Sequence, residues 1–284
     1  MQVWFSDQTD GFCISCRVKA VLHHERSSYQ EICVLDTDVF GRMLVLDDVI
    51  QTTERDEFTY HEMLVHVPLM IHPAPRRVAI IGGGDGGSVR EVAKHPEVGE
   101  IFLVEIDARV VWAARTFLPT ISCALQDGRV KILEEDGIAH MATKREEYDV
   151  IIVDAPDPVG AAVGLFSEEF YRSCCRALRP GGLMSAQVES PHFHRELVVR
   201  MYRTARRAFA DAAIYTSCVP SYPGGYWAFL LASRNEPLSL DLRGDAKELE
   251  TRYWTPEVHR AAFALPRFLQ EALEVVDREV SGRG

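Results

Sequence analysis

The chain has 284 residues and a formal net charge of −11 at pH 7, with 47% hydrophobic and 26% charged residues. This composition is typical of globular proteins and excludes disordered or collagen-like chains, and the acidic excess disfavours nucleic acid as a partner. Apolar runs such as Val78–Ile81 are far shorter than the ~20 residues of a membrane-spanning helix, and the first residues lack a signal-peptide pattern. We therefore expect a cytoplasmic protein that neither crosses a membrane nor binds nucleic acid.

The first part of the chain alternates apolar and polar residues in short runs. The clearest runs are Ile32–Leu35 and Met43–Leu46, separated by a turn-rich segment. This pattern predicts a small antiparallel β-meander, a first domain over residues 1–58. A helix is expected from about Arg55 to His66, ending before Pro68.

The pattern changes from Arg76 onward, where continuous apolar runs alternate with helical stretches. These runs, which indicate buried parallel strands, are Val78–Ile81, Ile101–Val104, Val130–Leu133 and Val150–Val153. A helix over Ser167–Leu178, capped by Ser167, and two further strands at Leu183–Val188 and Trp227–Ala232 continue the series. The sequence thus predicts an α/β fold with a Rossmann-like, doubly wound parallel sheet as a second domain over residues 59–284.

A glycine-rich loop follows the first of these strands. Gly82, Gly84 and Gly87 form GxGxxG between a strand and a helix that starts at Ser88. Such loops let a ligand approach the backbone closely and lie at a helix amino terminus. A tight glycine turn without a ligand is the alternative.

Acidic residues follow the next two strands. Glu105 lies 23 residues after Gly82, where a carboxylate can accept hydrogen bonds from both ribose hydroxyls. Asp136, followed by Gly137, can accept from the exocyclic amine of an adenine. Each acid alone is explained as a helix cap or a solvated strand end, but together with the glycine loop they favour an adenosine site.

Asp85 lies inside the glycine loop and discriminates between adenosine ligands. Intact S-adenosylmethionine would bring its carboxylate near this loop, and at ~4 Å the repulsion is on the order of 4 kcal/mol before screening. Asp85 therefore favours a ligand without that carboxylate, or one with an amine. The alternative is an Asp85 turned outward as a helix cap.

Asp154 and Asp157 flank a proline-rich segment after the fourth strand. Open α/β sheets bind substrates at this edge, so the two carboxylates can converge on one cation, and one of them can accept its proton. With Asp85 they place three acids around one opening. Asp-Pro pairs are also ordinary turn formers.

The whole chain resembles the spermidine synthase family, the polyamine aminopropyltransferases. The matching segments are Trp4-Phe5, Ser28–Gln30, Val49–Phe58, Tyr60–Met63, Gly82–Gly87, Arg90–Val92, Val104–Asp107, Asp136-Gly137, Asp154–Gly160, Pro220–Gly225 and His259–Pro266. The resemblance implies a sheet of the S-adenosylmethionine-dependent methyltransferase type. It implies transfer of the aminopropyl group of decarboxylated S-adenosylmethionine, a co-substrate, to putrescine, giving spermidine and methylthioadenosine. The resemblance implies neither a metal nor a tightly bound cofactor. It does imply a homodimer or homotetramer.

The resemblance also assigns roles by matching position. Asp154 resembles the proton acceptor. The polyamine-binding residues would be Tyr60, His61, Asp85, Asp154, Asp157, Tyr222 and Gln51. The residues around the nucleoside would be Gln30, Gly82, Gly84, Asp85, Glu105, Asp136, Gly137 and Ala161. Among these positions, Gln30 and Gln51 are expected in strands of the meander and have no local signal of their own.

Three departures from the family pattern stand out. Ala155-Pro156 replaces a segment with Ser or Thr, so hydroxyl support for the aspartates is expected to be missing. Ala161 replaces a proline, which puts one nucleoside contact in doubt, and Asp48 replaces a glycine, which should only change a turn.

Other functions stay open at this point. They are a methyltransferase that uses intact S-adenosylmethionine, a nicotinamide dehydrogenase, a non-catalytic polyamine-binding protein, and aminopropyl transfer to cadaverine or agmatine.

Overall fold

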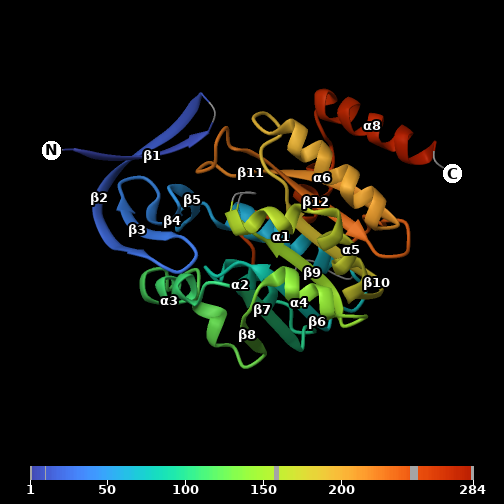
Figure 1. Cartoon of the computed structure of the whole chain (residues 1–284), viewed down its shortest axis with the longest axis horizontal. Coiled ribbons are helices and arrows are strands. Elements are labelled where there is room, and N and C mark those ends of the chain that lie inside the picture. Colours follow the sequence, from blue (N-terminus) through green and yellow to red (C-terminus); the bar gives the residue numbers. More distant parts are fainter. Residues whose placement is uncertain (1, 10, 157–159, 244–248, 283–284) are drawn as a thin grey trace.

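Two β-sheets of different kinds follow one another along the chain (Figure 1). The computed structural model describes residues 2–9, 11–156, 160–243 and 249–282. The first sheet is antiparallel, with its five strands in sequence order, and the second has seven strands. The strands of the first sheet are β1 (Val3–Thr9), β2 (Phe12–Arg26), β3 (Glu31–Thr37), β4 (Gly41–Leu46) and β5 (Val49–Thr53). The predicted meander is confirmed.

A tight hairpin joins β4 to β5. Leu46 pairs with Val49, so Asp47 and Asp48 are the two turn residues. Their φ angles are 46° and 65°, in the left-handed region that such hairpins require. Asp48 therefore adopts a backbone conformation that glycine favours.

The second sheet has the order β11-β12-β10-β9-β6-β7-β8. Its strands are β6 (Arg77–Gly82), β7 (Glu100–Glu105), β8 (Val130–Glu134), β9 (Tyr148–Asp154), β10 (Leu178–Gln187), β11 (Asp211–Cys218) and β12 (Tyr226–Ser233). Strands β8, β7, β6, β9 and β10 are parallel to their neighbours in that series. The apolar runs at positions 78–81, 101–104, 130–133 and 150–153 are therefore strands, as predicted.

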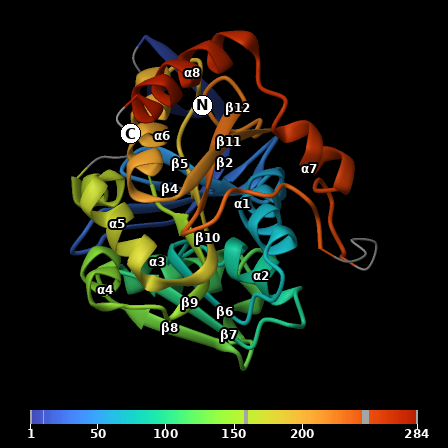
Figure 2. The same ribbon diagram turned by 90° about the vertical axis from the view of Figure 1, so that its right-hand side faces the viewer.

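Helices cover both faces of the second sheet (Figure 2). On one face, the side chains of Ala79 and Ile81 pack with α4 (Gly137–Thr143), α5 (Glu168–Ala177), α6 (Arg195–Ala208) and α8 (Arg267–Ser281). On the other, Val78 and Ile80 pack with α1 (Phe58–Ile71), α2 (Gly87–Ala93) and α7 (Pro256–Ala262). Two 3-10 helices are also present, η1 (Cys123–Gln126) and η2 (Gly160–Phe166). Burial of both faces explains why these strands are continuously apolar.

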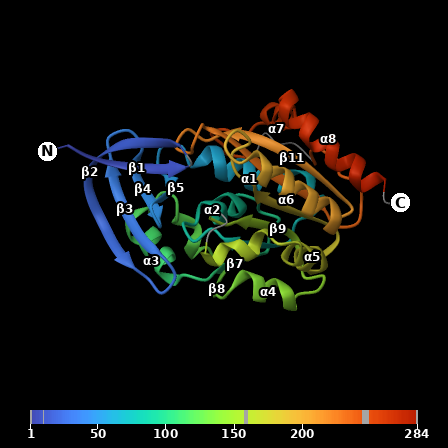
Figure 3. The same cartoon turned by 45° about the horizontal axis from the view of Figure 1, so that its top comes forward.

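Helix α3 (Ala108–Phe117) packs against both sheets (Figure 3). Its residues Val110 and Ala113 share an apolar cluster with Ile32, Val34 and Leu44 of the first sheet. Asp107 caps the helix by accepting a hydrogen bond from the Arg109 backbone N–H. The first sheet therefore packs beside the carboxyl ends of β6 and β7.

Helix α1 continues past the position where the sequence predicted its end. The helix runs from Phe58 to Ile71 and contains Pro68. Proline has no N–H to donate to the Leu64 carbonyl. The Ser185 hydroxyl on β10 donates to that carbonyl instead, at 2.7 Å. Tertiary contact thus replaces the missing helical bond, and the prediction of an end before Pro68 was wrong.

The edge of the second sheet differs from the predicted parallel arrangement. Strand β12 is antiparallel to both β10 and β11, and β11 has no counterpart among the predicted strands. A short turn, in which Gly224 and Gly225 have positive φ, connects β11 to β12 and makes them an antiparallel hairpin. Strand β10 begins at Leu178, directly after α5, rather than at Leu183.

No helix in the described ranges combines the length and the apolar character needed to span a membrane.

Candidate functional site

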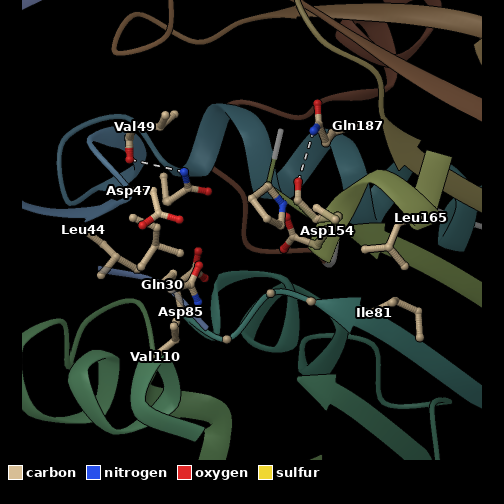
Figure 4. Close-up of a pocket in the computed structure, with 18 of the residues that line it drawn as sticks. Gln30, Leu44, Asp47, Val49, Ile81, Asp85, Val110, Asp154, Leu165 and Gln187 are labelled. Atoms are coloured by element: carbon tan, nitrogen blue, oxygen red, sulfur yellow. Dashed lines mark hydrogen bonds between the residues drawn. The ribbon is translucent and has the colours of Figure 1, made fainter. Parts of the chain in front are cut away.

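A cavity of about 610 Å³ lies between the two sheets. It is bounded by the carboxyl ends of β6, β7 and β9 and by residues of the first sheet (Figure 4). The sequence-predicted residues that line it are Gln30, Gln51, Tyr60, Gly82, Gly84, Asp85, Glu105, Asp136, Gly137, Asp154 and Tyr222. Asp157 lies outside the described residues, and Ala161 belongs to η2, next to the lining residue Ala162.

The glycine loop packs directly against neighbouring strand ends. Gly82 has a φ of 77°, and a Cβ atom there would lie 2.3 Å from the carbonyl oxygen of Asp154. The Gly83 N–H donates to that same oxygen at 2.8 Å. A Cβ atom at Gly84 would lie 2.9 Å from Glu105 Oε2. The glycines therefore bring the loop, Glu105 and Asp154 together on one wall of the cavity.

Glu105 ends β7 and is buried at one end of the cavity. Its Oε1 accepts a hydrogen bond from the Asp107 N–H at 2.9 Å. Burial raises the pKa of Glu105 to about 7. Asp107 also accepts from Gln30 Nε2 at 3.0 Å, which connects the first sheet to this end of the cavity. Gln30 lies one residue before β3.

Asp136 both caps a helix and lines the cavity. Its Oδ1 accepts from the Ile138 N–H at 2.8 Å and so caps α4, and its side chain also lines the cavity. A Cβ atom on the adjacent Gly137 would lie 2.4 Å from Ile81 Cγ2. The helix cap that the sequence offered as an alternative is thus present, and Asp136 also lines the cavity.

Asp154 ends β9 and is 9% exposed. The Tyr60 hydroxyl donates to its Oδ1 at 2.8 Å, and the Ser88 hydroxyl donates to its Oδ2 at 2.6 Å. Burial, reinforced by the nearby Asp85 carboxylate, raises the pKa of Asp154. Hydroxyl support was expected to be missing because of Ala155-Pro156, but it comes from α1 and α2. Ser88 was not among the predicted site residues; its only sequence signal is its place after the glycine loop.

Asp85 lines the cavity and also contacts Gly87 and His61. Its Oδ1 accepts from the Gly87 N–H at 2.6 Å and lies 3.4 Å from His61 Nε2. Burial opposes ionisation, but the neighbouring His61 holds the pKa of Asp85 below its ordinary value. Asp85 therefore lies inside the loop beside His61 and lines the cavity rather than turning away from it.

His61 lies behind these carboxylates. It is not among the described residues that line the cavity, and its side chain is 2% exposed. Its Nδ1 lies 2.7 Å from Glu57 Oε2, and its Nε2 lies 4.0 Å from Asp154 Oδ2. A Cβ atom at Gly87 would be 2.3 Å from the ring, so glycine is needed there for the ring to fit. In this geometry His61 touches the acids that line the cavity.

Aromatic side chains form one wall. The rings of Tyr60 and Tyr222 meet edge to face with centroids 5.7 Å apart, and Trp227 packs on Tyr222 at 4.6 Å. The Tyr222 hydroxyl donates to the Gln51 carbonyl at 2.6 Å, and Gln51 Nε2 donates to the Val49 carbonyl at 3.2 Å. The first sheet and the turn after β11 are thereby connected.

The cavity is also lined by polar residues that the sequence did not point to. Asp7 of β1 is buried, accepts from the Ile50 N–H at 2.9 Å, and has a pKa that burial raises. Glu189 has a φ of 79° and lies 3.0 Å from His194 Nδ1. Gln187 Nε2 donates to the Ala155 carbonyl at 3.1 Å (Figure 4). No motif marks these positions, and only the packing of β1 and β10 brings them here.

Comparison with known protein families gives two matches that together cover most of the chain. Residues 3–54 match the spermidine synthase tetramerisation domain, and residues 57–241 match the spermine/spermidine synthase domain.

Individual relatives are similar over nearly their whole length. The polyamine aminopropyltransferase of Moorella thermoacetica is 54% identical over 279 residues, covering 98% of each chain. That of Desulforudis audaxviator is 48% identical, covering 95% of this chain and 99% of the relative. A crystal structure of spermidine synthase in complex with the transition-state analogue AdoDATO has a TM-score of 0.90 and 36% identity, covering 96% of this chain and 95% of the other.

Proposed function

The chain belongs to the spermine/spermidine synthase family of polyamine aminopropyltransferases, and from this premise we propose that it converts putrescine to spermidine. The aminopropyl donor would be decarboxylated S-adenosylmethionine, and the second product would be methylthioadenosine. The donor is a co-substrate and methylthioadenosine is released as a product, so the proposal includes no tightly bound cofactor.

The observation that carries this proposal is the pair of buried carboxylates at the glycine loop. Asp85 and Asp154 line the same cavity, and both lie close to His61 Nε2. A dication is attracted by such a pair, whereas the carboxylate of intact S-adenosylmethionine would be repelled by Asp85. This supports a decarboxylated donor and an amine acceptor over methyl transfer.

The nucleoside would occupy the end of the cavity near Glu105. Glu105, the backbone of Gly82 and Gly84, and the Asp136-Gly137 pair lie around that end. A carboxylate at the end of β7 suits the two ribose hydroxyls, which are both donors. Gln30 would support this end through its hydrogen bond to Asp107.

The reaction would be a direct displacement. The lone pair of a neutral amine attacks the methylene carbon beside the sulfonium, the carbon–sulfur bond breaks, and its electron pair stays on sulfur as a neutral thioether. Asp154 would accept the proton that the attacking ammonium has to lose before its lone pair can react. Tyr60 and Ser88 hold this carboxylate in one orientation, so that the reacting groups are aligned.

The remaining predicted roles are part of the same proposal. Asp157 would add a second acid beside Asp154, and Tyr222, Gln51 and the aromatic wall would surround the carbon chain of the diamine. The match of residues 3–54 to a tetramerisation domain supports a homodimer or homotetramer built through the first sheet. A cytoplasmic location stays a prediction.

The test is an incubation with decarboxylated S-adenosylmethionine and putrescine, assayed for methylthioadenosine and spermidine. Parallel reactions with cadaverine and agmatine measure acceptor preference, and one with intact S-adenosylmethionine tests methyl transfer. Release of methylthioadenosine with putrescine is expected. Methyl transfer from the intact donor without aminopropyl transfer would contradict the proposal.

A second comparison tests the acidic anchor. An alkyl amine has a pKa near 10.4, so activity should rise between about pH 6.5 and 9.5 as the attacking amine loses its proton. Butylamine lacks the distal ammonium and should react far more slowly than putrescine. Equal kcat/KM values for the two amines would exclude the anchor.

A further inference from the structure

A line of buried charged side chains leads from the candidate site to helix α2. It begins at His61, which lies behind Asp85 and Asp154, at 3.4 and 4.0 Å from their nearest oxygens. On its other side, His61 Nδ1 contacts Glu57 at 2.7 Å. His61 can therefore act on a bound amine only through the two carboxylates.

Glu57 is held by both oxygens. The side chain is 4% exposed, and the Arg90 guanidinium donates to Oε1 through Nη1 at 3.0 Å and to Oε2 through Nη2 at 2.7 Å. This fork geometry is the strongest form of an arginine–carboxylate pair. Together with His61, this pair favours the ionised form of Glu57, although burial of the carboxyl group opposes it.

Arg90 is itself fixed from behind. Its Nε donates to Oε1 of Glu91 at 2.7 Å. Glu91 is fully buried, and its other oxygen contacts Lys94 at 2.7 Å and His66 Nε2 at 2.9 Å. Arg90 is not among the described residues that line the cavity, so it has no direct access to substrate.

We propose that Arg90 and Glu57 are positioning residues that keep His61 as an imidazolium behind Asp85 and Asp154, so that both carboxylates stay ionised when a cationic amine enters. The inference rests on the proposed function, because it explains how that acidic site keeps its charge. Two buried carboxylates near one another otherwise share a proton. A protonated carboxyl group neither anchors an ammonium nor accepts a proton.

The charged and titratable groups that face His61 support this assignment. They are Glu57 before α1, Asp85 after β6, Asp154 on β9, the Tyr60 ring at 5.2 Å, and Arg90 of α2 through Glu57. Burial opposes the charge, but Asp85 and Glu57 raise the pKa of His61 well above its ordinary value. Burial likewise opposes ionisation of Glu57, while His61 and Arg90 lower its pKa. Signs therefore alternate along the line.

Kinetics of Arg90→Gln and Glu57→Gln test the proposal. Near neutral pH we expect kcat/KM for putrescine to fall on the order of 10- to 100-fold, mostly through KM. The loss should shrink as pH rises, because higher pH ionises the carboxylates without help from His61. Arg90→Lys keeps the charge and should recover part of the activity. A loss that is constant across pH would show a merely structural role and overturn the inference.

Arg129→Gln is the matched control. Arg129 is also a partly buried arginine that pairs with a carboxylate, Asp127, and donates to the Ala93 carbonyl at the end of α2, but it does not contact Glu57. Any loss of kcat/KM for putrescine in this variant should be independent of pH. A pH-dependent loss equal to that of Arg90→Gln would assign the effect to a loosened α2.

The double variant tests whether Arg90 acts through Glu57. In a Glu57→Gln background, Arg90→Gln should lower kcat/KM by no more than about twofold, because its target is already removed. If the fold-losses in kcat/KM of the two single variants multiply in the double variant, the two side chains act independently, which would contradict the proposal.

A measurement without substrate separates this inference from the proposed function. Nitrogen NMR of labelled histidines, with His61 assigned by its loss in His61→Gln, reports the charge of the ring. Both ring nitrogens should be protonated at pH 7 in the wild type, and the titration should move to lower pH in Glu57→Gln. A neutral His61 at pH 7 overturns the inference even in an active enzyme, whereas absence of aminopropyl transfer with a charged His61 overturns only the proposed function.

Discussion

Asp154 is the residue on which the proposed proton transfer depends. Asp154→Asn keeps an oxygen that can accept from Tyr60 or Ser88 but removes the base. Turnover should fall by ~10²–10⁴-fold, the usual contribution of a positioned base. Initial rates at saturating substrates measure this, with methylthioadenosine binding as the control for an intact cavity. A folded variant that loses less than threefold would remove Asp154 from the role of base.

Asp85 should set the choice between the two forms of the donor. In Asp85→Asn the side-chain oxygen can still accept from the Gly87 N–H, so the loop is kept while the charge is lost. The affinity gap between decarboxylated and intact S-adenosylmethionine should narrow, and overall activity should weaken. Calorimetric titrations measure the gap, and methylthioadenosine, which has no carboxylate, should bind unchanged. An unaltered gap would mean that donor selection lies elsewhere.

At the scale of single residues, the sequence predicted acids far better than their partners. Asp85, Glu105, Asp136 and Asp154 were found because the end of a parallel strand fixes where its next side chain lies. Ser88 could not be recognised as a donor to Asp154, because the bond spans 66 residues and depends on the angle between α2 and β9. The position of His61 behind the acids depends equally on tertiary packing. The roles themselves stay predictions.

At the scale of the helix, Ser185 should matter for stability rather than catalysis. Ser185→Ala leaves the Leu64 carbonyl without a donor, because Pro68 cannot supply one. An unsatisfied buried group costs about 1–3 kcal/mol, so the unfolding midpoint in urea should fall clearly.

Ser122→Ala is the control for this prediction. The Ser122 hydroxyl also donates to a carbonyl, that of Ala114, but Leu118 N–H already donates there at 2.8 Å. Its loss should therefore be smaller, about 1 kcal/mol or less. Equal losses of stability in the two variants would show that the missing N–H of Pro68 does not make the Leu64 carbonyl depend on Ser185.

The elements that were predicted correctly are those with strong local patterns. Continuous apolar runs identified β6, β7, β8 and β9, and a serine cap followed by acids identified α5. Strand β11 lacks such a run, since its inward residues alternate with half-exposed ones at the edge of the sheet. The continuation of α1 through Pro68 depends on Ser185, which lies 121 residues away from the carbonyl it satisfies, and no local rule contains that information.

At the scale of the molecule, the net charge of −11 should speed the encounter with a dication. Added salt screens this attraction, with a Debye length of about 8 Å at 0.15 M. We expect kcat/KM for putrescine to fall several-fold between about 0.05 and 0.5 M sodium chloride, and less steeply for butylamine, which has one charge. Identical slopes for the two amines would show that long-range attraction has no part in recognition.

Glu62, next to His61 on α1, accepts hydrogen bonds from the backbone N–H groups of Arg252, Tyr253 and Trp254. The first of these bonds spans 190 residues of chain. At a synthesis rate of ~5–20 residues per second, the ribosome makes those donors roughly 10–40 s after Glu62. During that interval a carboxylate destined for the interior has to stay in water, so the helix that carries Tyr60 and His61 can dock finally only after residues 252–254 have been made. Assembly of the site is thus timed by a segment that is made well after the acids that line its cavity.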